Sequence, residues 1–81
     1  MLTVEALIQK TADRFNYAKV TFAHGTENAT DEAAYLIFGY LKLDHADAQN
    51  AYQRLINEGE LDVLEKMIKQ RIEENYPIAY I

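Results

Sequence analysis

The chain contains no cysteine and no serine, and it has one proline and three glycines among its 81 residues. Without cysteine, disulfides and thiolate metal sites are excluded, and nothing ties the chain to an oxidising compartment. Without serine or cysteine, it also lacks the usual side chains of nucleophilic catalysis. The glycines are too far apart to form a phosphate-binding loop or a dinucleotide-binding fingerprint: Gly25, Gly39 and Gly59.

Long apolar runs are missing as well. No stretch approaches the roughly 18 apolar residues that are needed to cross a bilayer. The first residues mix acidic, basic and apolar side chains, which is not the pattern of an export signal. We therefore expect a cytoplasmic protein with no membrane partner.

Positive charge is scarce. Eight Lys and Arg residues stand against thirteen Asp and Glu residues, which leaves a net charge of −5. This charge opposes a phosphate backbone, so direct binding of nucleic acid is not expected, whereas a basic protein partner would be attracted. Solubility alone is the simpler explanation for a mildly acidic surface.

The pattern that the chain does have is helical almost throughout. Apolar residues at steps of three and four predict a first helix over about residues 4–17, with Thr3 as its N-cap. A second helix is predicted over about 31–41, with Thr30 as its N-cap. Its first turn carries two carboxylates, which the helix dipole favours there: Asp31 and Glu32. The face of the first helix consists of Val4, Leu7, Ile8, Thr11, Ala12, Phe15 and Ala18.

Two further helices are expected in the second half of the chain. The third covers about 46–57 and stops near Gly59, and the fourth covers about 60–75 and ends before Pro77. The fourth helix carries one apolar stripe and two oppositely charged pairs at a spacing of four residues. The pairs are Asp62 with Lys66 and Glu65 with Lys69, and the stripe is Leu61, Leu64, Ile68 and Ile72.

After the last helix comes a short apolar tail, "YPIAYI", which has the composition of a strand. An unpaired apolar strand invites association, so we expect the tail to lead into a further domain. A tail that folds back onto the helices is the alternative. The predicted fold is all-α, a small bundle of four to five short helices over 1–76, followed at 77–81 by an extended linker segment.

Two polar clusters resemble metal sites at first sight. His24, Glu27 and Asp31 form one, and the stretch "DHAD" from Asp44 to Asp47 forms the other. Neither has the ligand spacing of a recognised metal motif. Asp44 or Asp47 is more simply explained as a helix cap.

The loop "HGTEN" also has a purely structural explanation. Gly25 allows a tight turn, and the side chain of Thr26 or Asn28 bonds to the local backbone. On this basis alone, the chain is a non-catalytic helical module.

Two segments add a resemblance to a known family. "HGTEN" followed by "DEA", and "RIEENYPIAY" after a charged helix, resemble the N-terminal region of PrmB-type enzymes, the ribosomal-protein glutamine methyltransferases of the HemK family. The resemblance runs from about Thr3 to Ile81. In that family the run through Tyr80 opens the hairpin between a helical domain and a catalytic domain.

The resemblance implies an enzyme that uses S-adenosylmethionine to methylate the side-chain amide of a glutamine in a large-subunit ribosomal protein. The family's glycine-rich cofactor loop and Asn-Pro-Pro-Tyr motif are absent from this chain, so it is expected to bind no cofactor and to catalyse nothing itself. The expected partners are a basic ribosomal protein and the chain's own catalytic domain. The expected substrate or interdomain contacts, with the carboxylates exposed, are His24, Gly25, Thr26, Glu27, Asn28, Asp31, Glu32 and Tyr80.

Two other functions stay open from the sequence. One is a free-standing acidic adaptor whose helices bind a partner helix. The other is the N-terminal domain of a DNA adenine methylase, because such enzymes share the Asn-Pro-Pro-Tyr motif. The acidic balance of the chain argues against DNA as the substrate.

Overall fold

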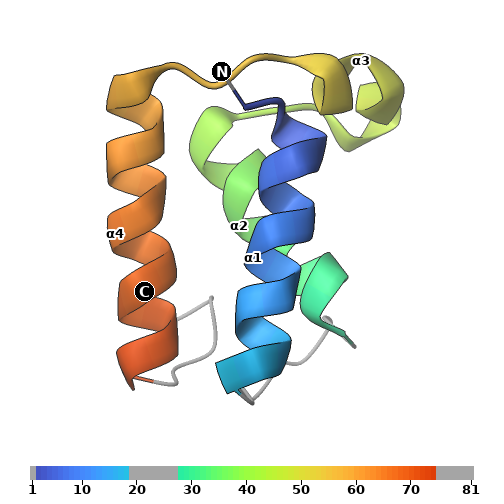
Figure 1. Ribbon diagram of the computed structural model, residues 1–81. Helices are drawn as coiled ribbons and strands as arrows, with labels where there is room; N and C mark the ends of the chain where they lie inside the picture. The colour runs from blue at the N-terminus through green and yellow to red at the C-terminus, as the bar shows by residue number, and fades with distance from the viewer. Residues whose placement is uncertain (1, 19–27, 75–81) are drawn as a thin grey trace.

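The structure is a computed structural model that describes residues 2–18 and 28–74. Within these ranges it consists of helices, and the prediction of a small all-α bundle is confirmed (Figure 1). The helices are α1 (Val4–Ala18), α2 (Ala29–Leu41), a short 3-10 helix (His45–Asp47), α3 (Ala48–Gln53) and α4 (Glu58–Glu74).

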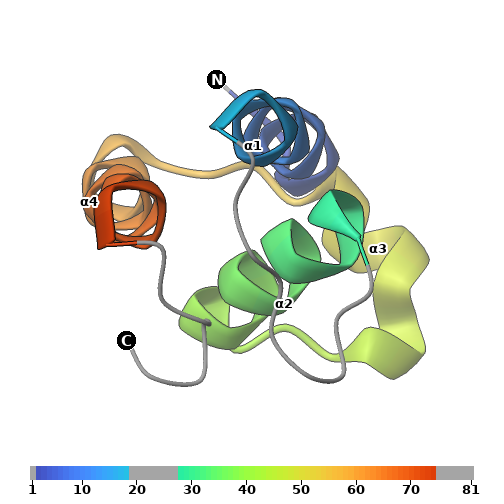
Figure 2. The same ribbon diagram turned by 90° about the horizontal axis from the view of Figure 1, so that it is seen from below.

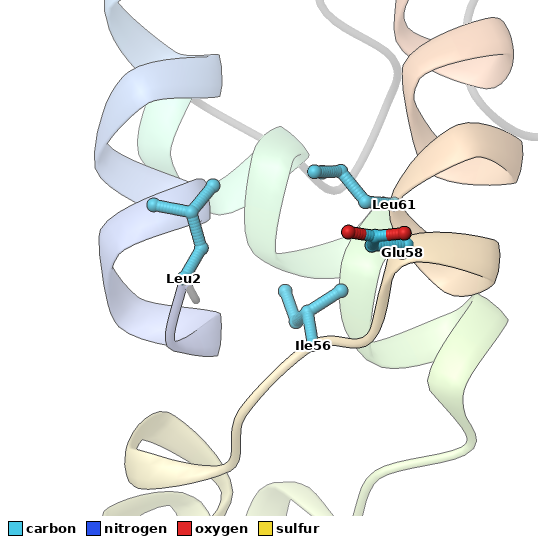
Figure 3. A pocket seen from close by; sticks show the side chains of 4 residues that line it. All are labelled: Leu2, Ile56, Glu58 and Leu61. Atoms are coloured by element: carbon cyan, nitrogen blue, oxygen red, sulfur yellow. The ribbon is translucent and has the colours of Figure 1, made fainter.

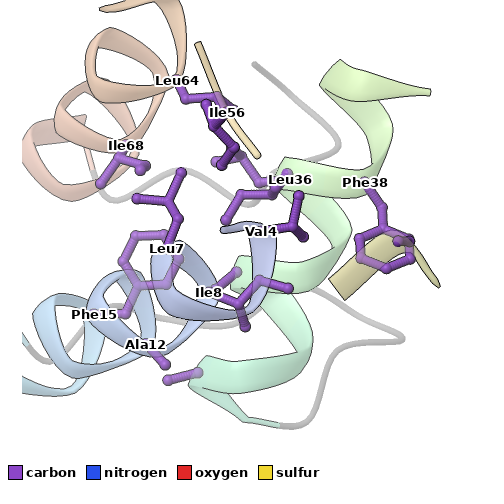
Figure 4. Close-up of a cluster of buried hydrophobic side chains, with 14 residues drawn as sticks. Val4, Leu7, Ile8, Ala12, Phe15, Leu36, Phe38, Ile56, Leu64 and Ile68 are labelled. Carbon is purple, nitrogen blue, oxygen red and sulfur yellow. The ribbon is translucent and has the colours of Figure 1, made fainter. Parts of the chain in front are cut away.

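The three longer helices, α1, α2 and α4, occupy the corners of a triangle when the molecule is viewed from below (Figure 2). The short helix α3 lies at one end of this arrangement. Apolar side chains from all three long helices fill the space between them and form one core (Figure 4). The buried apolar residues are Val4, Leu7, Ile8, Ala12, Phe15, Ala29, Ala33, Leu36, Ile37, Phe38, Ala51, Ile56, Leu64 and Ile68.

Helix α1 follows its prediction closely. The backbone N–H of Ala6 donates to Oγ1 of Thr3 at 3.2 Å, which confirms Thr3 as the N-cap. The predicted apolar face is buried as far as Phe15. Ala18, which was included in that face, is exposed because the helix ends there.

Helix α2 begins two residues earlier than predicted. Its N-cap is Asn28, whose Oδ1 accepts a hydrogen bond from the backbone N–H of Asp31 at 2.8 Å. The prediction of Thr30 as the cap is wrong. Asparagine caps at least as well as threonine, and a start at Asn28 brings Ala29 into the core, where its side chain is 3% exposed.

The third predicted helix is divided and ends early. A 3-10 turn comes first, capped by Asp44, whose Oδ1 accepts from the backbone N–H of Ala46 at 2.9 Å. Helix α3 then stops at Gln53 instead of continuing to 57. The following residues are extended and pair with the start of the chain, since Ile56 N–H donates to the Leu2 carbonyl at 2.8 Å. This non-local pairing replaces the last helical turn.

Gly59 does not end a helix, as was predicted, but lies in the first turn of α4. The helix starts there because Asn57 and Glu60 cap it reciprocally. Asn57 Oδ1 accepts from the Glu60 backbone N–H at 2.8 Å, and a carboxylate oxygen of Glu60 accepts from the Asn57 backbone N–H at 3.1 Å. Such a capping box satisfies two backbone donors and outweighs the low helix propensity of glycine.

The two charged pairs predicted along α4 are not formed among the described residues. Glu65 turns instead toward α1, where Arg14 lies 3.0 Å from its carboxylate. Both side chains are about one-third exposed, at 35% and 37%. This ion pair joins α1 to α4, whereas the predicted pairs would have stayed on one helix.

Candidate functional site

Most of the contact residues predicted from the sequence fall outside the described residues. These are His24, Gly25, Thr26, Glu27 and Tyr80. The metal cluster predicted around His24 falls outside with them. Asn28, Asp31 and Glu32 remain, and they lie together at the start of α2.

Asn28 and Asp31 act on the local backbone. Besides the capping bond to the Asp31 N–H, the Asn28 amide nitrogen lies 3.4 Å from a carboxylate oxygen of Asp31. Both side chains are exposed. The structural explanation given above for Asn28, a hydrogen bond to the local backbone, is therefore confirmed. The carboxylate of Asp31 is exposed to solvent.

Glu32 is not the exposed carboxylate that was expected. Its side chain is completely buried, and its Oε2 lies 2.8 Å from Nη2 of Arg71, which is completely buried as well. The pair links the first turn of α2 to the last turn of α4. The sequence analysis did not single out Arg71. The signal that could have revealed both residues is a charged side chain within the apolar stripe of its helix.

No group of three or more His, Cys, Asp or Glu side chains suited to hold a metal ion occurs among the described residues. In the "DHAD" stretch, Asp44 is a helix cap and His45 packs against Phe38, with ring centroids 4.7 Å apart. The prediction of a cap in this stretch is confirmed.

The two described glycines do not form a glycine-rich loop of the kind that binds S-adenosylmethionine in the family. Gly39 lies within α2 and Gly59 within the first turn of α4, so neither belongs to a loop that could hold a nucleotide. We therefore assign no step of the chemistry to these two residues. None of the described helices is both long and apolar enough to pass through a bilayer.

Two pockets open at the surface where α1 and α4 lie side by side. The first, the Leu2 pocket, has a volume of about 420 Å³ and is lined by Leu2, Ile56, Glu58 and Leu61 (Figure 3). Figure 3 shows the three apolar side chains pointing toward one space, with the carboxylate of Glu58 beside it. Apolar walls with one charged group suit the binding of a side chain.

The second, the Tyr17 pocket, lies at the opposite ends of the same two helices. It has a similar volume, about 420 Å³, and is lined by Asp13, Arg14, Tyr17, Ala18 and Ile72. Tyr17 is 92% exposed, the most of any large apolar side chain described. Sequence periodicity had not singled out either pocket.

Comparison with known proteins identifies the chain. The PrmC N-terminal domain family matches residues 6–81. The chain belongs to this family. The resemblance to the N-terminal region of a HemK-family methyltransferase is thereby confirmed.

Several curated relatives of this PrmC N-terminal domain carry the name ribosomal protein uL3 glutamine methyltransferase. The protein of Burkholderia pseudomallei is 34% identical over 98% of the chain, and that of Neisseria meningitidis serogroup B is 35% identical over the whole chain. The protein of Xanthomonas campestris pv. campestris is 36% identical over 98% of the chain. The chain spans about a quarter of the length of these relatives, 26% to 27%. No solved structure matches it.

Proposed function

We propose that this chain is the N-terminal domain of an S-adenosylmethionine-dependent methyltransferase that modifies the side-chain amide of a glutamine in ribosomal protein uL3. The observation that carries the proposal is the similarity along essentially the whole chain to enzymes of that name. The chain corresponds to about a quarter of those enzymes, which leaves room for a separate catalytic domain.

Within the enzyme, we assign substrate recognition to this domain and the chemistry to the remainder. Two surface pockets with apolar walls among the described residues support a binding role. Binding energy gained away from the reacting atoms lowers the barrier by positioning the target glutamine against the cofactor. A domain that only binds can therefore raise the rate.

The charge of the chain supports a ribosomal protein as the partner. A protein that binds ribosomal RNA must neutralise phosphates and is therefore basic. A domain with a net charge of −5 attracts such a protein and repels the RNA itself. We place this encounter in the cytoplasm.

The test is a methylation assay with the complete protein that contains this chain. Purified uL3, double-stranded DNA and an unrelated basic protein are offered as acceptors with labelled S-adenosylmethionine. We expect label only in uL3, and mass spectrometry should place one methyl group on a glutamine. Label in DNA, or no label in uL3, would overturn the proposal, as would a coding sequence without a catalytic domain.

A further inference from the structure

The two pockets described above lie on one continuous side of the α1–α4 pair. Glu58 and Leu61 line the Leu2 pocket and Ile72 lines the Tyr17 pocket, at spacings of three and eleven residues along α4. Three and eleven residues correspond to nearly whole numbers of helical turns, so all three side chains share one face of α4. Glu65, which pairs with Arg14, lies on the same face between them.

The distance between the pockets suits a short peptide. Leu61 and Ile72 are eleven residues apart in α4, and a rise of 1.5 Å per residue separates them by about 16 Å along the axis. An extended chain covers about 3.3 Å per residue, so about five residues reach from one pocket to the other.

Each pocket combines apolar walls with one carboxylate that is not engaged in an ion pair with a described residue. These carboxylates are Glu58 and Asp13. The cation in the Tyr17 pocket, Arg14, is already paired with Glu65. Two exposed charges nearby on α4, Asp62 and Lys69, offset each other. On α1 the exposed Lys10 precedes Asp13 by three residues and therefore lies beside it. The surface is thus apolar at both pockets and negative at Glu58.

We propose that these pockets bind the substrate polypeptide directly, as an extended basic segment of about five residues. One apolar side chain of the segment enters each pocket, and a neighbouring Lys or Arg faces Glu58. This inference rests on the proposed function, because uL3 is the partner whose charge it matches. Opposite charges steer the encounter, while the apolar anchors supply most of the affinity.

The test measures binding of the complete protein that contains this chain to purified uL3 by calorimetry at low and high salt. Tyr17→Ala removes the exposed wall of one pocket, and Glu58→Lys reverses the charge at the other. Tyr35→Ala is the control for the first, because Tyr35 is 53% exposed on α2, away from both pockets. Glu5→Lys is the control for the second.

Glu5 is a close match for Glu58. Both are exposed glutamates in the first turn of a long helix, so the loss of favourable dipole energy is the same. Glu5 precedes Arg14 by nine residues, or two and a half turns, and therefore lies on the far side of α1. Circular dichroism of all four variants checks that the helices are retained.

We expect Tyr17→Ala and Glu58→Lys each to weaken binding of uL3 by about tenfold, and the controls by less than about twofold. The loss from Glu58→Lys should shrink at high salt, whereas the loss from Tyr17→Ala should not. Unchanged affinity in both pocket variants, with normal binding by the wild type, would overturn this inference and leave the proposed function intact. Failure of the complete wild-type enzyme to methylate uL3 would overturn both.

Discussion

Arg71 Nη2 lies 2.8 Å from Glu32 Oε2, and neither side chain is accessible to solvent. The two residues are 39 positions apart, so the ion pair fixes the end of α4 against the start of α2. Removing two charges from water costs several kcal/mol for each ion, and the mutual attraction only offsets this cost. The pair therefore specifies how the helices are arranged more than it adds stability.

Breaking this pair should destabilise the domain strongly. We expect Arg71→Met to lower the free energy of unfolding by about 3 kcal/mol or more, because it leaves the carboxylate of Glu32 buried without its cation. The double variant Glu32→Leu, Arg71→Met removes both charges and should recover part of that loss. Urea denaturation of the single and double variants gives the coupling energy. A double variant that loses the sum of the two single losses would contradict this account.

The ion pair between Arg14 and Glu65 provides the matched control. It joins two helices at a similar separation, 3.0 Å, but its side chains are 35% and 37% exposed. Water already solvates these charges, so Arg14→Met should change the free energy of unfolding by about 1 kcal/mol or less. A large effect here would mean that burial is not what distinguishes the two pairs.

Stability should depend on pH through Glu60. Hydrogen bonds from the Arg54 guanidinium, at 2.8 and 3.1 Å, and from the Asn57 backbone N–H hold the pKa of Glu60 below its ordinary value of 4.5. A lowered pKa means that the ionised side chain stabilises the fold above the unfolded-state value and that this stabilisation is lost as the pH falls through the folded-state value.

Glu60→Gln isolates this charge. Glutamine retains an oxygen for the Asn57 N–H, so the capping box survives while the ion pair with Arg54 is lost. We expect a lower urea midpoint than the wild type near neutral pH and equal midpoints well below pH 4.5. The comparison requires unfolding curves at several pH values. A difference that persists in acid would assign the effect to packing.

The helices were predictable because their signals are local. The apolar period of α1, the cap at Thr3 and the approximate extent of α4 all depend on residues within a few positions of each other. The early end of α3 was not predictable in this way. It depends on hydrogen bonds with residues about 50 positions away: Val4 N–H donates to the Arg54 carbonyl, and Ile56 N–H donates to the Leu2 carbonyl.

The buried ion pair was predictable only in part. Glu32 follows Ala29 by three residues and precedes Leu36 by four, and Arg71 follows Ile68 by three, so each charge interrupts an apolar stripe. That signal is visible in the sequence. It does not show that the two interruptions meet, because partner choice depends on how α2 and α4 pack. The two pockets escaped prediction for the same reason.

At the end of α2 a lysine occupies the left-handed position that usually favours glycine, while a glycine lies inside the helix. Lys42 adopts a left-handed conformation with φ of 56°, and its N–H donates to Gly39, which is itself within the helix. Lys42→Gly should raise the free energy of unfolding by about 1 kcal/mol, because glycine has no Cβ to strain this conformation. Lys42→Ala keeps the Cβ and should bring no such gain. Thermal unfolding of both variants decides between strain and loss of the lysine side chain.

Gly39 offers a second, separate stabilisation. A Cβ built at this position meets no atom within 4 Å, so alanine fits without displacement. We expect Gly39→Ala to raise the free energy of unfolding by about 0.5 to 1 kcal/mol, through the lower entropy of the unfolded chain. Gly59→Ala is the matched variant in the first turn of α4, where the new Cβ would lie at an ordinary contact distance, 3.5 Å, from Asn57 Oδ1, so a similar gain is expected. Thermal unfolding measures both variants, and a loss of stability in Gly39→Ala would contradict this account.

Thr11 carries a hydroxyl in the buried core. The residue is completely buried in α1, and its Oγ1 has no hydrogen-bond partner in the described part of the chain. A buried hydroxyl without a partner costs about 1 to 3 kcal/mol. Thr11→Val replaces it with a methyl group of similar size and should stabilise the domain by about 1 kcal/mol. Thr11→Ser keeps the hydroxyl but loses the methyl group, so it should destabilise the domain by a similar amount. Opposite signs in urea denaturation would support this assignment, and a destabilised Thr11→Val variant would reveal a partner for the hydroxyl.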